Sequence, residues 1–201
     1  MPATPPLDAA VVLWSAPPEE RADRPLLVLL HGYGADENDL FGLVPYLPPE
    51  FVVAAVRAPL PPPWPAPGYS WFPIEGLETR DATRATESAA RFIEWLDTLP
   101  EHGPVGLVGF SQGAAIAIQA MRLDPGRFAF LVNLSGFATP GELPGDPLLA
   151  ERRPPAFWGR GTHDEVVPEA LVSTRSNGCP GTSTSAGASI RASPTASPTR
   201  S

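Results

Sequence analysis

The feature that most constrains the fold is an apolar run that leads into the pattern Gly-x-Ser-x-Gly at Gly109, Ser111 and Gly113. In a nucleophile elbow of this pattern the serine sits on a sharp turn between a strand and a helix. The flanking glycines let the two backbones pack closely. The context agrees, because residues 105–110 are of strand type and apolar residues recur at helical spacing over 111–123. The sequence therefore predicts a strand, an exposed serine and a helix in that order.

Further strand-like runs alternate with helical stretches along the chain. A second helix is predicted over 79–99, where the apolar residues fall on one face. This alternation predicts an α/β fold with a mostly parallel central sheet covered by helices on both faces. In such sheets, ligands bind outside the carboxyl ends of the strands. The predicted strands are 11–15, 26–30, 51–56, 105–110, 129–134 and 156–160.

Two further segments, like Ser111, follow the carboxyl ends of predicted strands. His31-Gly32-Tyr33-Gly34 follows the strand 26–30, and the backbone N–H of Tyr33, together with that of Gln112, is predicted to bind a developing oxyanion. A turn after the strand 156–160 carries Asp164, which is predicted to orient a general base. A solvated turn aspartate is the alternative interpretation of Asp164.

Length, charge and cysteine content limit the class of protein. A chain of 201 residues suits one α/β domain, and its net charge of −8 argues against a nucleic-acid partner. The N-terminal residues lack a basic segment followed by an apolar one, so no signal peptide is expected. No apolar run approaches the ~20 residues of a membrane span. Cys179 is the only cysteine, which fits a reducing cytoplasm.

The composition changes near residue 172. Residues 173–201 contain no Asp or Glu, and Ile190 is their only large aliphatic side chain. Such a segment buries too little apolar surface to offset its chain entropy. We expect a folded domain over 1–172 and a disordered tail rich in Ser, Thr, Pro and Arg over 173–201.

Several segments together resemble the carboxylesterase/phospholipase branch of the α/β hydrolases, which includes the acyl-protein thioesterases. The resemblance implies a three-layer α/β-hydrolase fold and hydrolysis of carboxylic esters or thioesters through an acyl-enzyme on Ser111. It implies a small ester or acyl substrate, no cofactor and no metal. It also implies that Trp71 and Phe72 lie near the acyl pocket. The matching segments are residues 31–37, 57–59, 71–72, 109–114, 161–164 and 167–168.

The chain departs from this family in one respect. The family takes its general base from a histidine that follows one more strand after the aspartate, and no histidine follows Asp164 in the sequence. The three histidines are His31, His102 and His163, and none is expected to serve as the base. We interpret the residues after about Val172 as a shifted reading frame that replaces the last strand and helix of the fold.

The expected consequence is a large loss of turnover. Removal of a triad histidine costs a factor on the order of 10⁶, and the oxyanion donors and substrate binding leave ~10³–10⁴ over water. A non-catalytic acyl-binding or interaction protein and a broken gene product remain alternatives. The sequence leaves open the acyl chain length, ester against thioester, lipid against small molecule, and the oligomeric state, a homodimer included.

Overall fold

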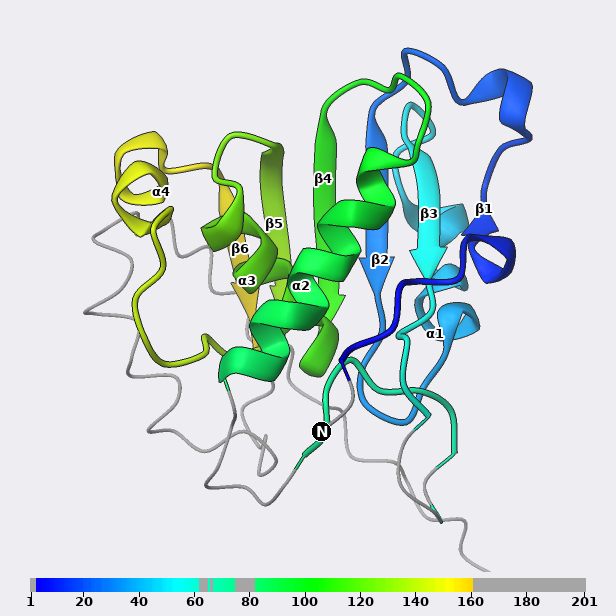
Figure 1. Cartoon of the computed structure of the whole chain (residues 1–201). Helices are drawn as coiled ribbons and strands as arrows, with labels where there is room; N and C mark the ends of the chain where they lie inside the picture. The colour runs from blue at the N-terminus through cyan, green and yellow to red at the C-terminus, as the bar shows by residue number, and fades with distance from the viewer. Residues whose placement is uncertain (1–2, 62–64, 66, 75–81, 161–201) are drawn as a thin grey trace, which may run out of the picture.

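The computed structural model describes residues 3–61, 65, 67–74 and 82–160. Its strands form one six-stranded sheet in the order β1-β3-β2-β4-β5-β6 (Figure 1). The strands are β1 (Leu13–Trp14), β2 (Leu26–Leu30), β3 (Val52–Val56), β4 (Val105–Phe110), β5 (Phe128–Leu134) and β6 (Ala156–Gly159). The helices are α1 (Glu37–Phe41), α2 (Ala82–Asp97), α3 (Gln112–Leu123) and α4 (Asp146–Arg152), with short 3₁₀ helices η1 (Ala9–Val11), η2 (Pro18–Glu20) and η3 (Val44–Tyr46).

The mostly parallel sheet predicted from the sequence is confirmed. Strands β2 to β6 pair in parallel, and β1 runs antiparallel to β3, with Leu13 opposite Ala55. All six predicted strands are present within a few residues of their expected bounds. The predicted loss of the last strand and helix and the predicted domain boundary at residue 172 concern residues 161–201, which lie outside the described part of the chain.

Alternation along β2 shows how the sheet separates two apolar layers. Val28 and Leu30 pack into the larger cluster with α2 and α3, which cross one face of the sheet in Figure 1. Leu27 and Leu29 point to the other face, where they belong to the cluster that contains Leu40 of α1. Strands buried on both faces are typical of parallel sheets. The three-layer α/β architecture is thus confirmed.

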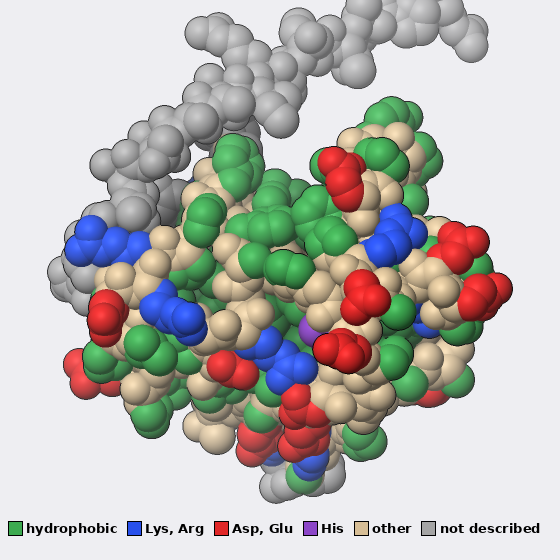
Figure 2. Space-filling view, turned by 90° about the horizontal axis from the view of Figure 1, so that it is seen from above, with side chains coloured by type: hydrophobic (Ala, Val, Ile, Leu, Met, Phe, Trp, Pro, Cys, Tyr) green, Lys and Arg blue, Asp and Glu red, His purple; other side chains and the backbone are tan. Residues whose placement is uncertain are grey.

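Strands β2 to β6 run in one direction, so their amino ends lie at one end of the sheet, the amino-end face of the molecule, and their carboxyl ends lie at the other. Figure 2 looks onto the amino-end face, where apolar side chains gather in the middle and acidic and basic side chains are interspersed around them. Segments that follow β2 and β4 lie at the opposite face (Figure 1). The residues predicted to carry the chemistry follow these strands.

Candidate active site

Ser111 occupies a strained turn between β4 and α3. Its φ of 49° and ψ of −113° lie in a region that non-glycine residues seldom adopt. Such a conformation costs on the order of 1–3 kcal/mol and persists only where the surroundings hold it. Here the Ser111 N–H donates to the Leu134 carbonyl at 2.8 Å, and the Ser111 carbonyl accepts from the Ala115 N–H at 3.1 Å. Strand β5 and helix α3 therefore fix the turn from both sides.

The two glycines that flank the serine are required by close backbone contacts. A Cβ at Gly109 would lie 2.4 Å from Cα of Ala114, and a Cβ at Gly113 would lie 2.2 Å from the carbonyl oxygen of Leu30. Cβ atoms do not approach other atoms so closely, so any larger residue would push α3 away from the sheet. The spacing of the sequence pattern therefore reflects packing between β2, β4 and α3.

The segment after β2 comes close to Ser111. A Cβ on Gly32 would lie 2.9 Å from Cδ1 of Phe110 and 3.6 Å from Cβ of Ser111. Within the described part of the chain, the backbone N–H groups of Tyr33 and Gln112 have no hydrogen-bond acceptor. Unpaired N–H groups beside a serine hydroxyl can bind an anionic oxygen. The loop and the start of α3 thus present free donors next to the strained turn.

His31 is a structural residue, as expected from the sequence. The ring is 1% exposed, its Nε2 accepts from the Ala58 N–H at 3.0 Å, and its Nδ1 lies 2.7 Å from the Gly32 carbonyl. This arrangement requires the neutral tautomer with the proton on Nδ1. Burial lowers the pKa of the ring below its ordinary value of 6.5. With both nitrogens engaged by backbone groups, His31 has none free to accept a proton from Ser111.

Trp71 and Phe72 are buried at 0% and 4% exposure in the larger apolar cluster. The Trp71 indole N–H donates to the His31 carbonyl at 2.8 Å. The Trp71 backbone N–H and the Phe72 carbonyl bind the side chain of Gln112. The predicted role of the two aromatic residues in the acyl pocket stays a prediction, whereas their connection to Gln112 was missed, since sequence spacing reports only on the backbone of the elbow.

A second missed feature is the ion pair between Glu37 and Arg57. The guanidinium binds both carboxylate oxygens, donates to the Tyr69 hydroxyl at 3.2 Å and lies 4.5 Å above the Tyr69 ring. The Arg57 hydrogen bonds lower the pKa of the Glu37 carboxyl, which is only 5% exposed. The pair joins the start of α1 to the segment after β3. Helix α1 begins immediately after residues 31–36, the loop after β2 that carries Tyr33 (the Tyr33 loop). A buried glutamate needs such a partner, but its partner cannot be identified by sequence alone.

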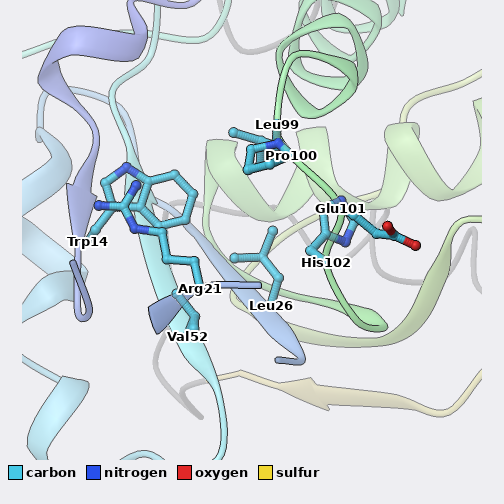
Figure 3. Close-up of a pocket in the computed structure, with 8 residues that line it drawn as sticks. All are labelled: Trp14, Arg21, Leu26, Val52, Leu99, Pro100, Glu101 and His102. Atoms are coloured by element: carbon cyan, nitrogen blue, oxygen red, sulfur yellow. The ribbon is translucent and has the colours of Figure 1, made fainter. Parts of the chain in front are cut away.

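His102 lies at the amino-end face, opposite Ser111. It lines a small cavity of about 40 Å³ with Leu26 and Val52, the first residues of β2 and β3 (Figure 3). Ligand pockets are usually several hundred Å³, so this cavity is too small for a substrate. His102 therefore lies, as predicted, at the end of the sheet where the strands begin.

The remaining predicted site residue falls outside the described part of the chain. Asp164 and the neighbouring His163 both belong to residues 161–201. Among the described residues, no group of three or more His, Cys, Asp or Glu side chains could hold a metal ion. None of the described helices is long and apolar enough to cross a membrane.

The geometry agrees with a comparison against protein families. A family model described as phospholipase/carboxylesterase matches residues 15–179 of the chain. The chain belongs to the phospholipase/carboxylesterase family. The resemblance noted in the sequence is thereby confirmed, and the matched range includes Ser111, the Tyr33 loop and Asp164.

Individual proteins are similar to this chain over shorter or more divergent stretches. The esterase YpfH of Escherichia coli is 30% identical over 121 residues, and the match covers 55% of this chain and 51% of the esterase. The match thus spans about half of that relative. A carboxylesterase of Mesorhizobium loti superimposes with a TM-score of 0.65 at 23% identity, over 87% of this chain and 85% of the other. Acyl-protein thioesterase 2 of Zea mays gives 0.63 at 24% identity over 81% and 80%. These two structures share the fold.

Proposed function

We propose that the chain is built as a serine hydrolase that cleaves carboxylic esters or thioesters through an acyl-enzyme on Ser111. The observation that carries the proposal is the strained backbone of Ser111, with the unpaired N–H of Gln112 directly after it and that of Tyr33 in the loop that approaches it. Family membership and the names of the relatives, an esterase in Escherichia coli and an acyl-protein thioesterase in Zea mays, support the same class of reaction.

In the proposed reaction the Ser111 hydroxyl oxygen attacks the carbonyl carbon of the substrate. The carbonyl oxygen becomes an oxyanion that the N–H groups of Tyr33 and Gln112 bind. Collapse of this intermediate breaks the bond to the alcohol or thiol, which leaves with a proton, and water then hydrolyses the acyl-serine. Asp164 would orient the base that moves these protons. The reaction needs no cofactor.

No histidine of residues 1–201 is identified as the general base for Ser111. His31 has both ring nitrogens engaged and His102 lies at the other end of the sheet. No histidine follows Asp164 in this sequence. We therefore expect turnover lowered by a factor on the order of 10⁶ relative to an intact triad. The same placement of histidines favours the alternative, a protein that binds acyl groups without turnover.

The substrate is proposed to be a small apolar ester or acyl compound. The Phe110 side chain is 42% exposed although it is aromatic, and its ring lies against Gly32 beside Ser111. It therefore offers apolar surface next to the nucleophile, in addition to the pocket proposed at Trp71 and Phe72. We place the protein in the cytoplasm, because a single cysteine suits a reducing compartment.

The test is hydrolysis of p-nitrophenyl butyrate by the 201-residue chain and its Ser111→Ala variant. Ser88→Ala is the matched control, because Ser88 is fully buried in α2, away from the elbow. Because the oxyanion donors and substrate binding alone sustain a slow rate, the deciding readout is the acyl group itself, and we expect mass spectrometry to find a butyryl group on Ser111 in the wild type and in Ser88→Ala, and none at this position in Ser111→Ala. Absence of the butyryl group from a wild-type protein that melts cooperatively would refute acyl transfer to Ser111 and leave the acyl-binding alternative. Butyrylthiocholine in place of the oxygen ester distinguishes thioesters.

A further inference from the structure

The side chain of Gln112 binds a segment far away in the sequence. Its Oε1 accepts from the Trp71 N–H at 2.8 Å, and its Nε2 donates to the Phe72 carbonyl at 2.7 Å. The amide is thus paired at both ends with the backbone of two consecutive residues. Because Gln112 is the first residue of α3, this contact fastens the 69–72 segment to the start of the helix that follows Ser111.

The same segment is fastened to the loop after β2. The Trp71 indole N–H donates to the His31 carbonyl at 2.8 Å. The Gly34 N–H donates to the Tyr69 carbonyl at 2.9 Å, and the Tyr69 N–H donates to the Ala35 carbonyl at 2.8 Å. Residues 69–72 therefore lie between the Gln112 side chain and the loop that carries Tyr33, and they are hydrogen-bonded to both.

The three side chains at the centre of this connection are shielded from water. Gln112 is 2% exposed, Trp71 0% and His31 1%. In the interior, a lost hydrogen bond leaves an unsatisfied group that water does not reach, so a fully paired buried network holds its members in one arrangement. Removal of the amide would leave the buried Trp71 N–H without an acceptor and the Phe72 carbonyl with the Ser70 hydroxyl as its remaining donor, and the link between the segment and α3 would be lost.

We propose that the Gln112 side chain is a positioning residue for the oxyanion site. Through its contacts with Trp71, which binds His31, the side chain fixes the position of the Tyr33 N–H relative to the backbone N–H of Gln112. The inference rests on the proposed function and adds to it, because the side chain acts separately from the backbone donor of the same residue. Any substitution at position 112 other than proline keeps that donor, so the two roles can be separated by experiment.

The experiment compares Gln112→Met with Gln119→Met in the full chain. Gln119 is a second glutamine of α3, 1% exposed, and it binds Thr86, Arg122 and Thr139 instead of the Tyr33 loop. Amide hydrogen exchange by mass spectrometry reports on peptides that cover 31–36 and 69–72. We expect exchange there to accelerate about tenfold or more in Gln112→Met and to stay near the wild-type rate in Gln119→Met. Equal exchange in the two variants overturns the proposal, whatever the chain catalyses.

A second readout tests the consequence for the oxyanion site. Butylboronic acid forms a tetrahedral adduct with a serine hydroxyl and places an oxygen where the ester oxyanion would form. We expect Gln112→Met to weaken its affinity about tenfold or more, and Gln119→Met to leave it within about twofold. If amide exchange accelerates in Gln112→Met but its affinity for the boronate stays unchanged, the positioning role is overturned. If Ser111→Ala binds the boronate as well as the wild type, the proposed function fails, and the exchange experiment still decides whether Gln112 holds the loop.

In the residual hydrolysis of p-nitrophenyl butyrate, the same proposal predicts a specific split. Oxyanion donors act in the transition state, so kcat should fall in Gln112→Met while KM stays near its wild-type value. A purely structural loss would lower the fraction of folded protein in both glutamine variants alike. Rates that fall equally in Gln112→Met and Gln119→Met at matched stability would contradict the proposal.

Discussion

Gly113 of helix α3 faces the backbone of Leu30 so closely that an added Cβ would lie 2.2 Å from the Leu30 carbonyl oxygen. A main-chain carbonyl in a central strand does not move aside as a flexible side chain does. We therefore expect Gly113→Ala to lower the free energy of unfolding by about 3 kcal/mol or more. Urea denaturation checks this, with Gly42→Ala as control, since a Cβ at Gly42 meets no described atom within 4 Å. Equal losses in the two variants would contradict the packing argument.

The strained turn predicts an unusual stability order at position 111. Glycine adopts the φ of 49° more easily than alanine. Ser111→Gly should therefore be more stable than Ser111→Ala by about 1 kcal/mol. The control is position 88 in α2, where glycine should be the less stable residue by about 1 kcal/mol. The same order at both positions, measured by urea denaturation, would show that the turn holds no strain.

The Glu37–Arg57 pair predicts a loss of stability that depends on pH. Arg57→Met leaves the buried Glu37 carboxylate without its partner, and we expect a loss of about 2–3 kcal/mol at pH 7. The Arg57 hydrogen bonds hold the pKa of Glu37 below its ordinary value of 4.5. The stabilisation is therefore present above pH 4.5 and is lost as the pH falls through the lowered pKa. Urea midpoints of the two proteins should converge in acid, and a constant difference down to pH 3 would contradict an electrostatic origin.

The buried His31 ring predicts a second dependence of stability on pH, between pH 7 and pH 5. Burial lowers its pKa below 6.5, so the unfolded chain binds a proton first as the pH falls. The contribution of neutral His31 is complete above pH 6.5 and declines toward pH 5, by at most about 1.4 kcal/mol per pH unit. His31→Gln, which does not titrate, should show a smaller decline between pH 7 and 5. Parallel curves for the two proteins would refute this role.

Strong periodicity explains which parts of the fold were predictable. Strands β2 and β4 are continuous apolar runs, and α2 has one apolar face, so their residue types leave few alternatives. Helices α1 and α4 were missed because they are only five and seven residues long. Helix α1 begins with the polar residues Glu37-Asn38-Asp39, and a cap from Asp36 rather than an apolar stripe defines its start. Short helices of this kind depend on local capping and tertiary contacts, which periodicity does not detect.

The parts of the candidate site that the backbone itself forms could be predicted from the sequence. The pattern around Ser111 implies a turn, and the glycine-rich loop after β2 implies free N–H groups, because both follow from strand order. The contacts of Gln112, Arg57 and His31 were not predictable, since each depends on which distant segment lies opposite. The predicted role of Asp164 remains a prediction, since this residue lies beyond the described ranges.

The contact between Gly113 and Leu30 has a consequence for how such a sequence can diverge. It is made by two main chains, so the spacing between α3 and β2 does not depend on which apolar side chains fill the core around it. Core residues can be exchanged for others of similar volume without displacing the start of the helix. Changes among the apolar side chains of the core can therefore accumulate while the start of the helix keeps its place, whereas any side chain at position 113 forces the two main chains apart.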